Sequence, residues 1–527
     1  MIQYTTRKLI FAFSAVFLAA IILYSCFFKT DKAVTGHMIL MPGYSRLYVE
    51  EYGSVINGYE DDGVVYFFLP AYMHLDGVDY EMSLLRIYEK DGELLIKPKM
   101  NEIMEVDMGE DNTLMTPYKV AFYQSENLYS IDISLSGNSI GDIDHDDYID
   151  GFMVSHSPDG TMGYAGKVSI KGRGNSTWGN PKNPYEIKLA EEVSFCGMKP
   201  SDKWALLANY FDDTKIVNKM VYDTAAKIGM EYAIESDWID LYINGDYVGN
   251  YLMCHEPHIS STDLDIGNLE KENRPFFDPH NTFDNGNLRG YNYTDLPHDI
   301  SGGYLVEATY LDIYEMKNSG FILDSGKAFS IKSPDNAAFE EVQYIAGFMN
   351  NIDSEIHTGD VREALKHIDI DSFAKRFLID EVFYNVDESQ TSYFFYKKPQ
   401  YDIIYAGPCW DYDKSCGIGG RGRDFNESTL DDNASETLDW IDRLMEFPEF
   451  RQYVTRVLKK DKDMFEDLFL YGIDNYAKRI RASLKMDGIR WDNESTEEAL
   501  FRLKEYIKLR FEFIKRKYEI NTGEREK

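Results

Sequence analysis

The chain has 527 residues, of which 44% are hydrophobic and 14% are aromatic. This composition supports a large packed core in two or three domains, and it excludes disorder over most of the chain. Lysine and arginine total 55 against 90 aspartate and glutamate residues, so the net charge is −35. Such an acidic body repels nucleic acid and attracts cations and basic partners, although the charge also fits simple solubility in a salty setting. No two of the five cysteines form a CxxC pair, which excludes a zinc ribbon.

Residues 9–28 form a nearly continuous apolar run that is long enough to span a bilayer as a helix. Arg7 and Lys8 precede it, so the positive-inside rule places the N-terminus in the cytoplasm and the body outside the cell. Residues 1–36 are therefore predicted to be the anchor of a single-pass membrane protein. A lipid anchor is the alternative, because the residues up to Cys26 loosely resemble a bacterial lipobox, with cleavage before Cys26 and acylation of that residue.

Residues 37–140 alternate apolar and polar positions between Gly and Asp turns, which predicts a β-rich accessory domain. Three aspartates at alternate positions open residues 140–151 as in a calcium loop. Asp147 and Met153 stand where that loop requires Gly and Glu, so we interpret the segment as an acidic surface turn.

Residues 150–527 are predicted to form a second domain. Strand patterns come first, with a hairpin at Asn244-Gly245, and amphipathic helices fill residues 433–520. Strands followed by helices indicate an α+β class.

A glycine-rich turn opens this domain, with Lys-Gly-Arg-Gly-Asn-Ser-Thr-Trp at residues 171–178. Such a turn after a strand exposes backbone N–H groups that bind anions, and Arg173 adds a fork-shaped donor suited to phosphate. Lys188 lies in the next strand beside apolar residues, where an unpaired ammonium would be costly. A tight turn and a salt-bridged lysine would account for these residues equally well.

Two groups of carboxylates follow later in the chain. Asp387 stands between a helical segment and an apolar strand, where it could accept a proton from an attacking hydroxyl or simply end the helix in a turn. Asp411 and Asp413 follow a strand with one residue between them, and such a pair of carboxylates suits Mg²⁺ or Mn²⁺. The same Asp-x-Asp pattern occurs in nucleotide-sugar glycosyltransferases and in ordinary loops.

The order of these parts is that of a protein kinase, although neither His-Arg-Asp nor Asp-Phe-Gly is present. Six ordered blocks across about residues 164–420 resemble those of the CotH kinases, the spore coat protein H-like atypical protein kinases. The blocks lie at residues 171–189, 204–218, 241–256, 302–307, 385–387 and 410–413.

The resemblance implies an atypical protein-kinase-like, two-lobed fold with ATP and Mg²⁺ or Mn²⁺ as cofactors. It also implies phosphorylation of Ser or Thr in secreted or coat proteins, and the acidic body favours a basic substrate. By this resemblance Lys188 contacts the ATP phosphates, and Arg173 and Asn218 are further ATP-binding candidates.

The same resemblance implies that Asp387 is the catalytic base and that Asp411 holds the metal, with Asp413 in support. Many members place Asn a few residues after the base as a second metal ligand, where this chain has Gln390 and Ser392. A non-catalytic cell-surface adhesin on the same scaffold and an Asp-x-Asp glycosyltransferase are the alternatives.

Overall fold

The computed structural model describes residues 37–41, 45–49, 52–73, 84–89, 92–96, 99–106, 118–174, 177–296, 299–358, 361–385, 391–418, 430, 434, 439–492 and 496–518. The chain divides into two compact units. The first unit comprises Met1–Val55, His74–Pro98 and Gly109–Asp111, and the second comprises Ile56–Met73, Lys99–Met108 and Asn112–Lys527. Every candidate site residue belongs to the second unit.

The first unit contains a five-stranded sheet with the order β3-β2-β1-β6-β7. In this sheet β1 pairs antiparallel with β2 and parallel with β6. Leu47 and Val49 of β2 are buried, as expected for alternate residues on one face of a strand. The strands are β1 (His37–Met41), β2 (Arg46–Val49), β3 (Ser54–Asn57), β6 (Leu84–Glu89) and β7 (Gly92–Ile96).

A small sheet with the order β4-β5-β9-β8 belongs to the second unit. Phe68 and Tyr123 of this sheet pack against Tyr247 of the body in one buried cluster. The division between units therefore differs from the predicted boundary, because part of residues 37–140 buries its apolar face against the body. The strands are β4 (Tyr59–Asp61), β5 (Val64–Leu69), β8 (Ile103–Val106) and β9 (Tyr118–Gln124).

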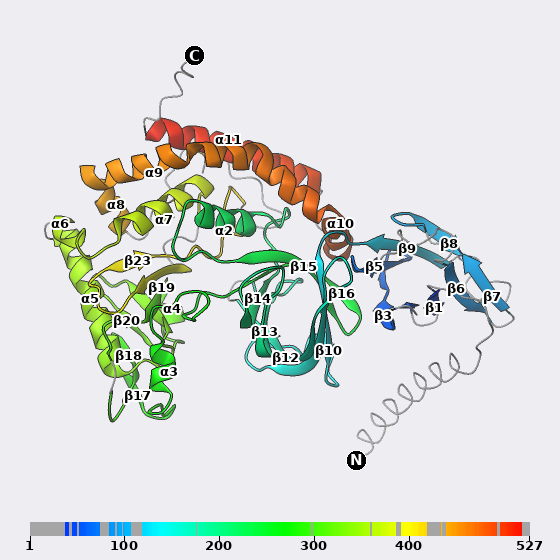
Figure 1. Ribbon diagram of the computed structural model, residues 1–527, viewed down its shortest axis with the longest axis horizontal. Helices are drawn as coiled ribbons and strands as arrows, with labels where there is room; N and C mark the ends of the chain where they lie inside the picture. Colours follow the sequence, from blue (N-terminus) through cyan, green and yellow to red (C-terminus); the bar gives the residue numbers. More distant parts are fainter. Residues whose placement is uncertain are drawn as a thin grey trace. The chain divides into compact units, whose positions relative to one another are not determined.

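A closed seven-stranded barrel forms one part of the body, with the order β10-β11-β12-β13-β14-β16-β15 (Figure 1). Every second side chain points inward, and Ile131, Ile187 and Trp204 are fully buried in its core. The predicted hairpin is confirmed, with positive φ at Asn244 and Gly245. The strands are β10 (Tyr129–Leu135), β11 (Ile149–His156), β12 (Met162–Gly172), β13 (Tyr185–Val193), β14 (Ser201–Leu207), β15 (Ser236–Ile243) and β16 (Asp246–Cys254).

A second seven-stranded sheet has the order β17-β18-β20-β21-β19-β22-β23. β19 pairs antiparallel with both β21 and β22, so it lies inside the sheet, and five of its six residues are buried. The strands are β17 (Thr282–Asp284), β18 (Leu288–Tyr291), β19 (Tyr304–Thr309), β20 (Gly320–Ile322), β21 (Ala328–Ser333), β22 (Tyr393–Lys397) and β23 (Ile404–Ala406).

Helices complete the second unit. α7 is buried along almost its whole length and contacts α2, α9, α11 and β23 (Figure 1). The helices are α2 (Val217–Lys227), α3 (Leu269–Asn273), α4 (Leu311–Tyr314), α5 (Phe339–Thr358), α6 (Val361–Ala364), α7 (Ile370–Phe383), α8 (Asp439–Met445), α9 (Pro448–Asp467), α10 (Ile473–Trp491) and α11 (Thr496–Lys517).

The predicted α+β class is thus confirmed, whereas the kinase-like, two-lobed arrangement stays a prediction. In the part of the chain that the structure describes, we find no helix with the length and apolar character needed to cross a membrane. The predicted anchor at residues 9–28 lies outside the described residues.

Two buried polar contacts attach α10 to the barrel. The ammonium of Lys182 donates to Asp487 Oδ1 and to the carbonyl of Asn250, each at 2.5 Å. The side chain of Asp240 on β15 accepts from the hydroxyls of Ser483 at 2.6 Å and Tyr247 at 3.1 Å. Burial raises the pKa of Asp240 to about 6, although these hydroxyls lower it.

We predict that Asp240→Asn raises the free energy of unfolding at pH 7 by roughly 1 to 3 kcal/mol. The folded carboxyl has a pKa of about 6 against an ordinary value of 3.8. Between these values the folded state binds more protons than the unfolded state, so stability falls as pH rises. The variant has no such carboxyl, so its free energy of unfolding should no longer fall with pH across this range. Urea unfolding at a series of pH values measures this. Asp202→Asn, at an exposed position on β14, is the control, and a destabilised Asp240 variant at pH 7 would contradict the prediction.

Candidate active site

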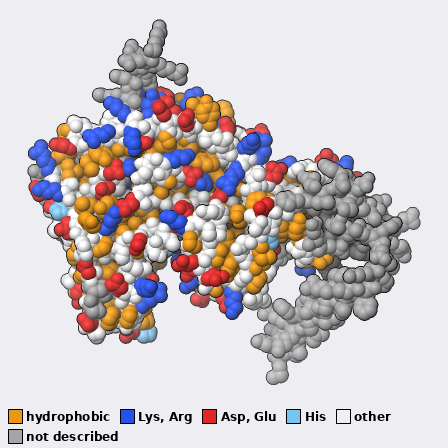
Figure 2. Space-filling view, viewed as in Figure 1, with side chains coloured by type: hydrophobic (Ala, Val, Ile, Leu, Met, Phe, Trp, Pro, Cys, Tyr) orange, Lys and Arg blue, Asp and Glu red, His pale blue; other side chains and the backbone are white. Residues whose placement is uncertain are grey.

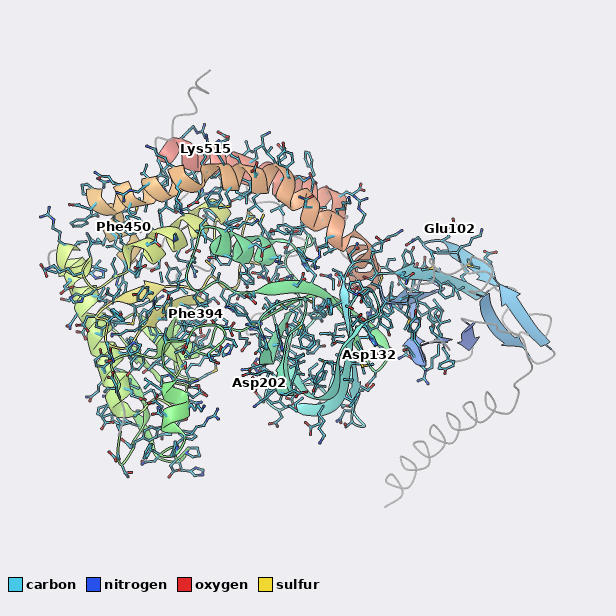
Figure 3. The ribbon with its side chains drawn as sticks, in the orientation of Figure 1. Glu102, Asp132, Asp202, Phe394, Phe450 and Lys515 are labelled. Atoms are coloured by element: carbon cyan, nitrogen blue, oxygen red, sulfur yellow. The ribbon has the colours of Figure 1, made fainter. Side chains whose placement is uncertain are left out.

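A polar cavity of about 490 Å³ lies between the barrel and the seven-stranded sheet. Its barrel side comes from β12, β13, β14 and the turn after β12, and its other side comes from β19, β21 and β22. Phe394 of β22 lies on this second side (Figure 3). The volume lies within the range of small-ligand pockets. Arg173, Asn218, Asp411 and Asp413 all line this cavity.

The glycine-rich turn approaches the cavity as predicted, but part of its backbone is already bonded. The N–H of Gly172 donates to the carbonyl of Asp144 at 2.6 Å, and that of Arg173 donates to Pro184 at 3.2 Å. Gly174 has φ +86°, and a Cβ at Gly172 would lie 2.2 Å from the ring of Trp178, so both positions require glycine. Among the described residues of this turn, anion binding therefore depends on side chains more than on these two N–H groups.

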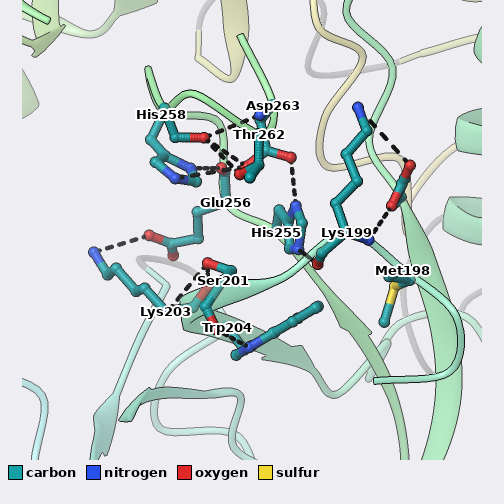
Figure 4. Close-up of polar contacts among 12 residues, drawn as sticks. Met198, Lys199, Ser201, Lys203, Trp204, His255, Glu256, His258, Thr262 and Asp263 are labelled. Carbon is teal, nitrogen blue, oxygen red and sulfur yellow. Dashed lines mark hydrogen bonds and ion pairs between the residues drawn. The ribbon is translucent and has the colours of Figure 1, made fainter. Parts of the chain in front are cut away.

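Four charged side chains form a network on the barrel side of the cavity. Arg173 Nε donates to Glu256 Oε1 at 2.9 Å. The ammonium of Lys203 lies 3.4 Å from Glu256 Oε2 and 3.1 Å from Glu186 Oε2 (Figure 4 shows Lys203 and Glu256). Burial by itself raises the pKa of Glu256, but the charges of Arg173 and Lys203 outweigh it and lower the pKa well below its ordinary value.

His255 fixes the end of β16, where Glu256 follows. Its Nδ1 lies 2.5 Å from Asp263 Oδ1, and its Nε2 lies 3.1 Å from the carbonyl of Lys199 (Figure 4). The ring also packs against Trp204, with centroids 4.4 Å apart. These contacts hold the backbone that presents Glu256 to the two cations.

Lys188 does not line the cavity, so its predicted contact with ATP phosphates lacks geometric support. On β13 the side chains of Tyr185, Ile187 and Leu189 point into the barrel, which places Lys188 on the outer face. There it is exposed to solvent, beyond the part of the strand that faces the cavity. Lys203, whose Cα is the register partner of Lys188 on the neighbouring strand, does line the cavity. Four other described lysines also line it, namely Lys171, Lys317, Lys332 and Lys414.

Asn218 reaches the cavity from the first turn of α2, where it fixes the loop that carries the two aspartates. Its Oδ1 accepts from the backbone N–H of Tyr412 at 2.7 Å, and its Nδ2 donates to Asn209 Oδ1 at 2.9 Å. Asp411 has a positive φ of 66°, and its N–H donates to the hydroxyl of Tyr222 at 3.4 Å. Asn218 therefore orients a candidate metal ligand, whatever else it contacts.

Asp387 lies outside the described residues, so its predicted role as the base stays a prediction. The described residues on either side frame that segment. Asn385 is buried and donates to Asp380 Oδ1 at 3.2 Å, and Thr391 and Ser392 line the cavity. The N–H of Ser392 donates to Glu307 Oε1 at 3.0 Å.

Asp411 and Asp413 both line the cavity, and the hydroxyl of Ser392 donates to Asp411 Oδ2 at 3.4 Å. No group of three His, Cys, Asp or Glu side chains with metal-binding geometry occurs among the described residues. Mg²⁺ is commonly held by one or two carboxylates together with substrate phosphates. Two adjacent aspartates beside a cationic wall fit that donor set.

Sequence reasoning missed Lys203 and Glu186 and assigned no role to Glu256. The sequence does show that Glu186 and Lys188 share one face of β13. They alternate with the apolar residues Tyr185, Ile187 and Leu189, which occupy the other face. No sequence pattern showed whether Glu186 or Lys188 points toward the cavity, because that depends on how the strand lies relative to the second sheet.

A comparison of the chain with protein-family models gives a match. The family model described as CotH kinase protein matches residues 170–514, which include the glycine-rich turn, the cationic network and the two aspartates. A search of curated proteins found no match. Since the family match covers well over half of its length, the chain belongs to the CotH kinase protein family.

Proposed function

We propose that this protein transfers the γ-phosphoryl group of ATP to Ser or Thr side chains of another protein. Membership of a kinase family supports a phosphoryl-transfer role. One observation carries the proposal further: a single cavity brings together the turn after β12, the Arg173–Glu256–Lys203 network and the two aspartates. Phosphoryl transfer needs positioning and charge stabilisation, and this cavity supplies cations on one wall and metal-binding carboxylates on another.

We assign the phosphate-binding role to Lys203 and Arg173 in place of Lys188. Glu256 forms ion pairs with both cations and fixes their positions across the barrel strands. Arg173 also lies over the ring of Trp410, with its guanidinium carbon 5.4 Å from the ring centroid. Cations that are held in place before the nucleotide arrives lose little conformational freedom on binding it.

Asp411 and Asp413 would hold Mg²⁺ or Mn²⁺ together with the nucleotide phosphates. The ion would neutralise the negative charge that develops on those phosphates. The chain's own part is to fix the loop, through the bonds from Tyr412 to Asn218 and from Ser392 to Asp411. Asp387 would accept the proton of the substrate hydroxyl.

We predict that Lys203→Met weakens ATP binding at least tenfold, because a charge-assisted contact to phosphate is lost and Glu256 and Glu186 lose a counter-charge. Lys188→Met, at the register partner on the next strand, is the matched control and should change affinity less than about twofold. Thermal stabilisation by Mg²⁺-ATP measures both, since a ligand of the native state raises its stability. Equal losses in the two variants would contradict the assignment to Lys203.

We predict that Asp387→Asn lowers the rate of phosphate transfer by about 100-fold or more and leaves nucleotide affinity unchanged. The substitution keeps the shape of the side chain and removes the charge that receives the proton. Autophosphorylation with labelled ATP and Mn²⁺ measures transfer, and labelled nucleotide sugar on the same preparation tests for glycosyl transfer. A stable variant that transfers phosphate at the wild-type rate would remove Asp387 from the mechanism.

We further propose that the body lies on the outer face of the cell, anchored by residues 9–28 or by a lipid on Cys26. Arg7 and Lys8 before the apolar run support this orientation. Protease added to intact cells should then degrade residues 37–527. Complete protection of the body on intact cells, with degradation after lysis, would refute the placement.

A further inference from the structure

A second groove of about 570 Å³ lies between α9 and the end of α11, and it shares no lining residue with the cavity described above. We call it the α9–α11 groove. Figure 3 labels Phe450 near the start of α9 and Lys515 near the end of α11, which mark the two helices. The residues that matter for its chemistry are Arg451, Thr455, Arg456, Lys459, Lys517 and Tyr518.

The periodicity of α9 places these polar residues on one face. Arg451, Thr455 and Lys459 recur every four residues, so they lie on one face of the helix. Phe450 and Val454 occupy the opposite face and are buried in the core. Packing of α9 therefore fixes the direction in which its cationic face points.

The groove concentrates positive charge in a chain whose net charge is −35. Four cations line it and no acidic residue does. Arg451 donates to the carbonyls of Met445 and Glu446, and the ammonium of Lys517 lies 2.8 Å from Glu381. Arg456 and Lys459 form no ion pair with any residue that the structure describes.

Neutral polar groups accompany these cations. Thr455 places a hydroxyl in the groove, and this hydroxyl donates to the carbonyl of Arg451 at 2.9 Å. Tyr518 is 8% exposed, and within the described residues its hydroxyl has no hydrogen-bond partner. Blue side chains are also visible over the region of α9 in the space-filling view (Figure 2).

We propose that the α9–α11 groove binds a phosphorylated Ser or Thr in a segment of a protein substrate. A phosphate monoester carries nearly two negative charges and three acceptor oxygens, which match several converging donors better than a single carboxylate does. Arg456 and Lys459 supply such donors with no ion-pair partner among the described residues, and Arg451 and Lys517 lie beside them in the lining. The source of the phosphoserine rests on the proposed function, because that reaction produces it.

The test uses the full-length chain and a fluorescently labelled peptide with one phosphoserine in an otherwise uncharged sequence. Its unphosphorylated twin, a twin with Glu at the same position and free inorganic phosphate are the comparison ligands. Fluorescence anisotropy is measured without nucleotide or divalent ion at physiological salt, so that screening limits non-specific attraction.

Arg456→Met and Lys459→Met test the groove, and Lys460→Met is the matched control. Lys460 follows Lys459 on the same helix, is largely exposed and lies 3.9 Å from Asp461. We expect the phosphopeptide to bind wild type at least tenfold tighter than its unphosphorylated twin. Each groove variant should lose at least fivefold of that affinity, and the control should lose less than twofold. Unchanged melting temperatures show that the variants are folded.

Equal affinity for the phosphorylated and unphosphorylated peptides would overturn the proposal. So would wild-type affinity in both groove variants, because the peptide would then occupy another site. An equally tight Glu peptide would make the groove a site for acidic segments, and displacement by inorganic phosphate at the peptide's own concentration would make it a free-anion site. Both outcomes overturn the assignment. Peptide binding needs no catalysis, so a chain that binds the phosphopeptide but transfers no phosphate would sink only the proposed function.

Discussion

The buried pair between Arg376 and Asp380 on α7 holds the candidate active site together. Arg376 Nε donates to Asp380 Oδ2 at 2.7 Å, and both side chains are completely excluded from solvent. Burial raises the pKa of Asp380, although the charge of Arg376 and the hydroxyl of Tyr412 lower it. Arg376 also donates to the carbonyl of Pro408 at 2.8 Å, and Asp380 accepts from Tyr412 and Asn385. One helix thus fixes both the loop that carries Asp411 and the residue from which the Asp387 segment departs.

Local chemistry explains which parts of the fold could be predicted. The Asn244-Gly245 turn was predictable because two consecutive residues with positive φ are a property of that dipeptide itself. A local arrangement also marks the start of α2, where Asp212 accepts from the N–H groups of Ile216 and Val217. Closure of the barrel was not predictable, because β10 pairs in parallel with β15, more than one hundred residues later, and such pairing leaves no local pattern.

In the candidate site, too, residues in local motifs were predictable and residues that depend on long-range contacts were not. Arg173 and the Asp411-Tyr-Asp413 run were found because each belongs to a compact motif at a turn, and the structure places them at one cavity. The phosphate-binding lysine was assigned to Lys188, since strand alternation identifies a face but not what lies opposite that face. Lys203 acquires its importance from Glu256, which is 53 positions away in the sequence and reaches it only when β14 pairs with β16. A long-range electrostatic partner of this kind can be read only from the folded chain.

The contact between Lys182 and Asp487 has a consequence for the order of events during synthesis. A lysine that precedes β13 becomes paired only when the aspartate of α10 has been made, 305 residues later. Until then the ammonium of Lys182 has no carboxylate partner, and the Asn250 backbone N–H that binds the same carboxylate lacks its acceptor. The nascent barrel is consequently an incomplete folding unit while the chain is still being made.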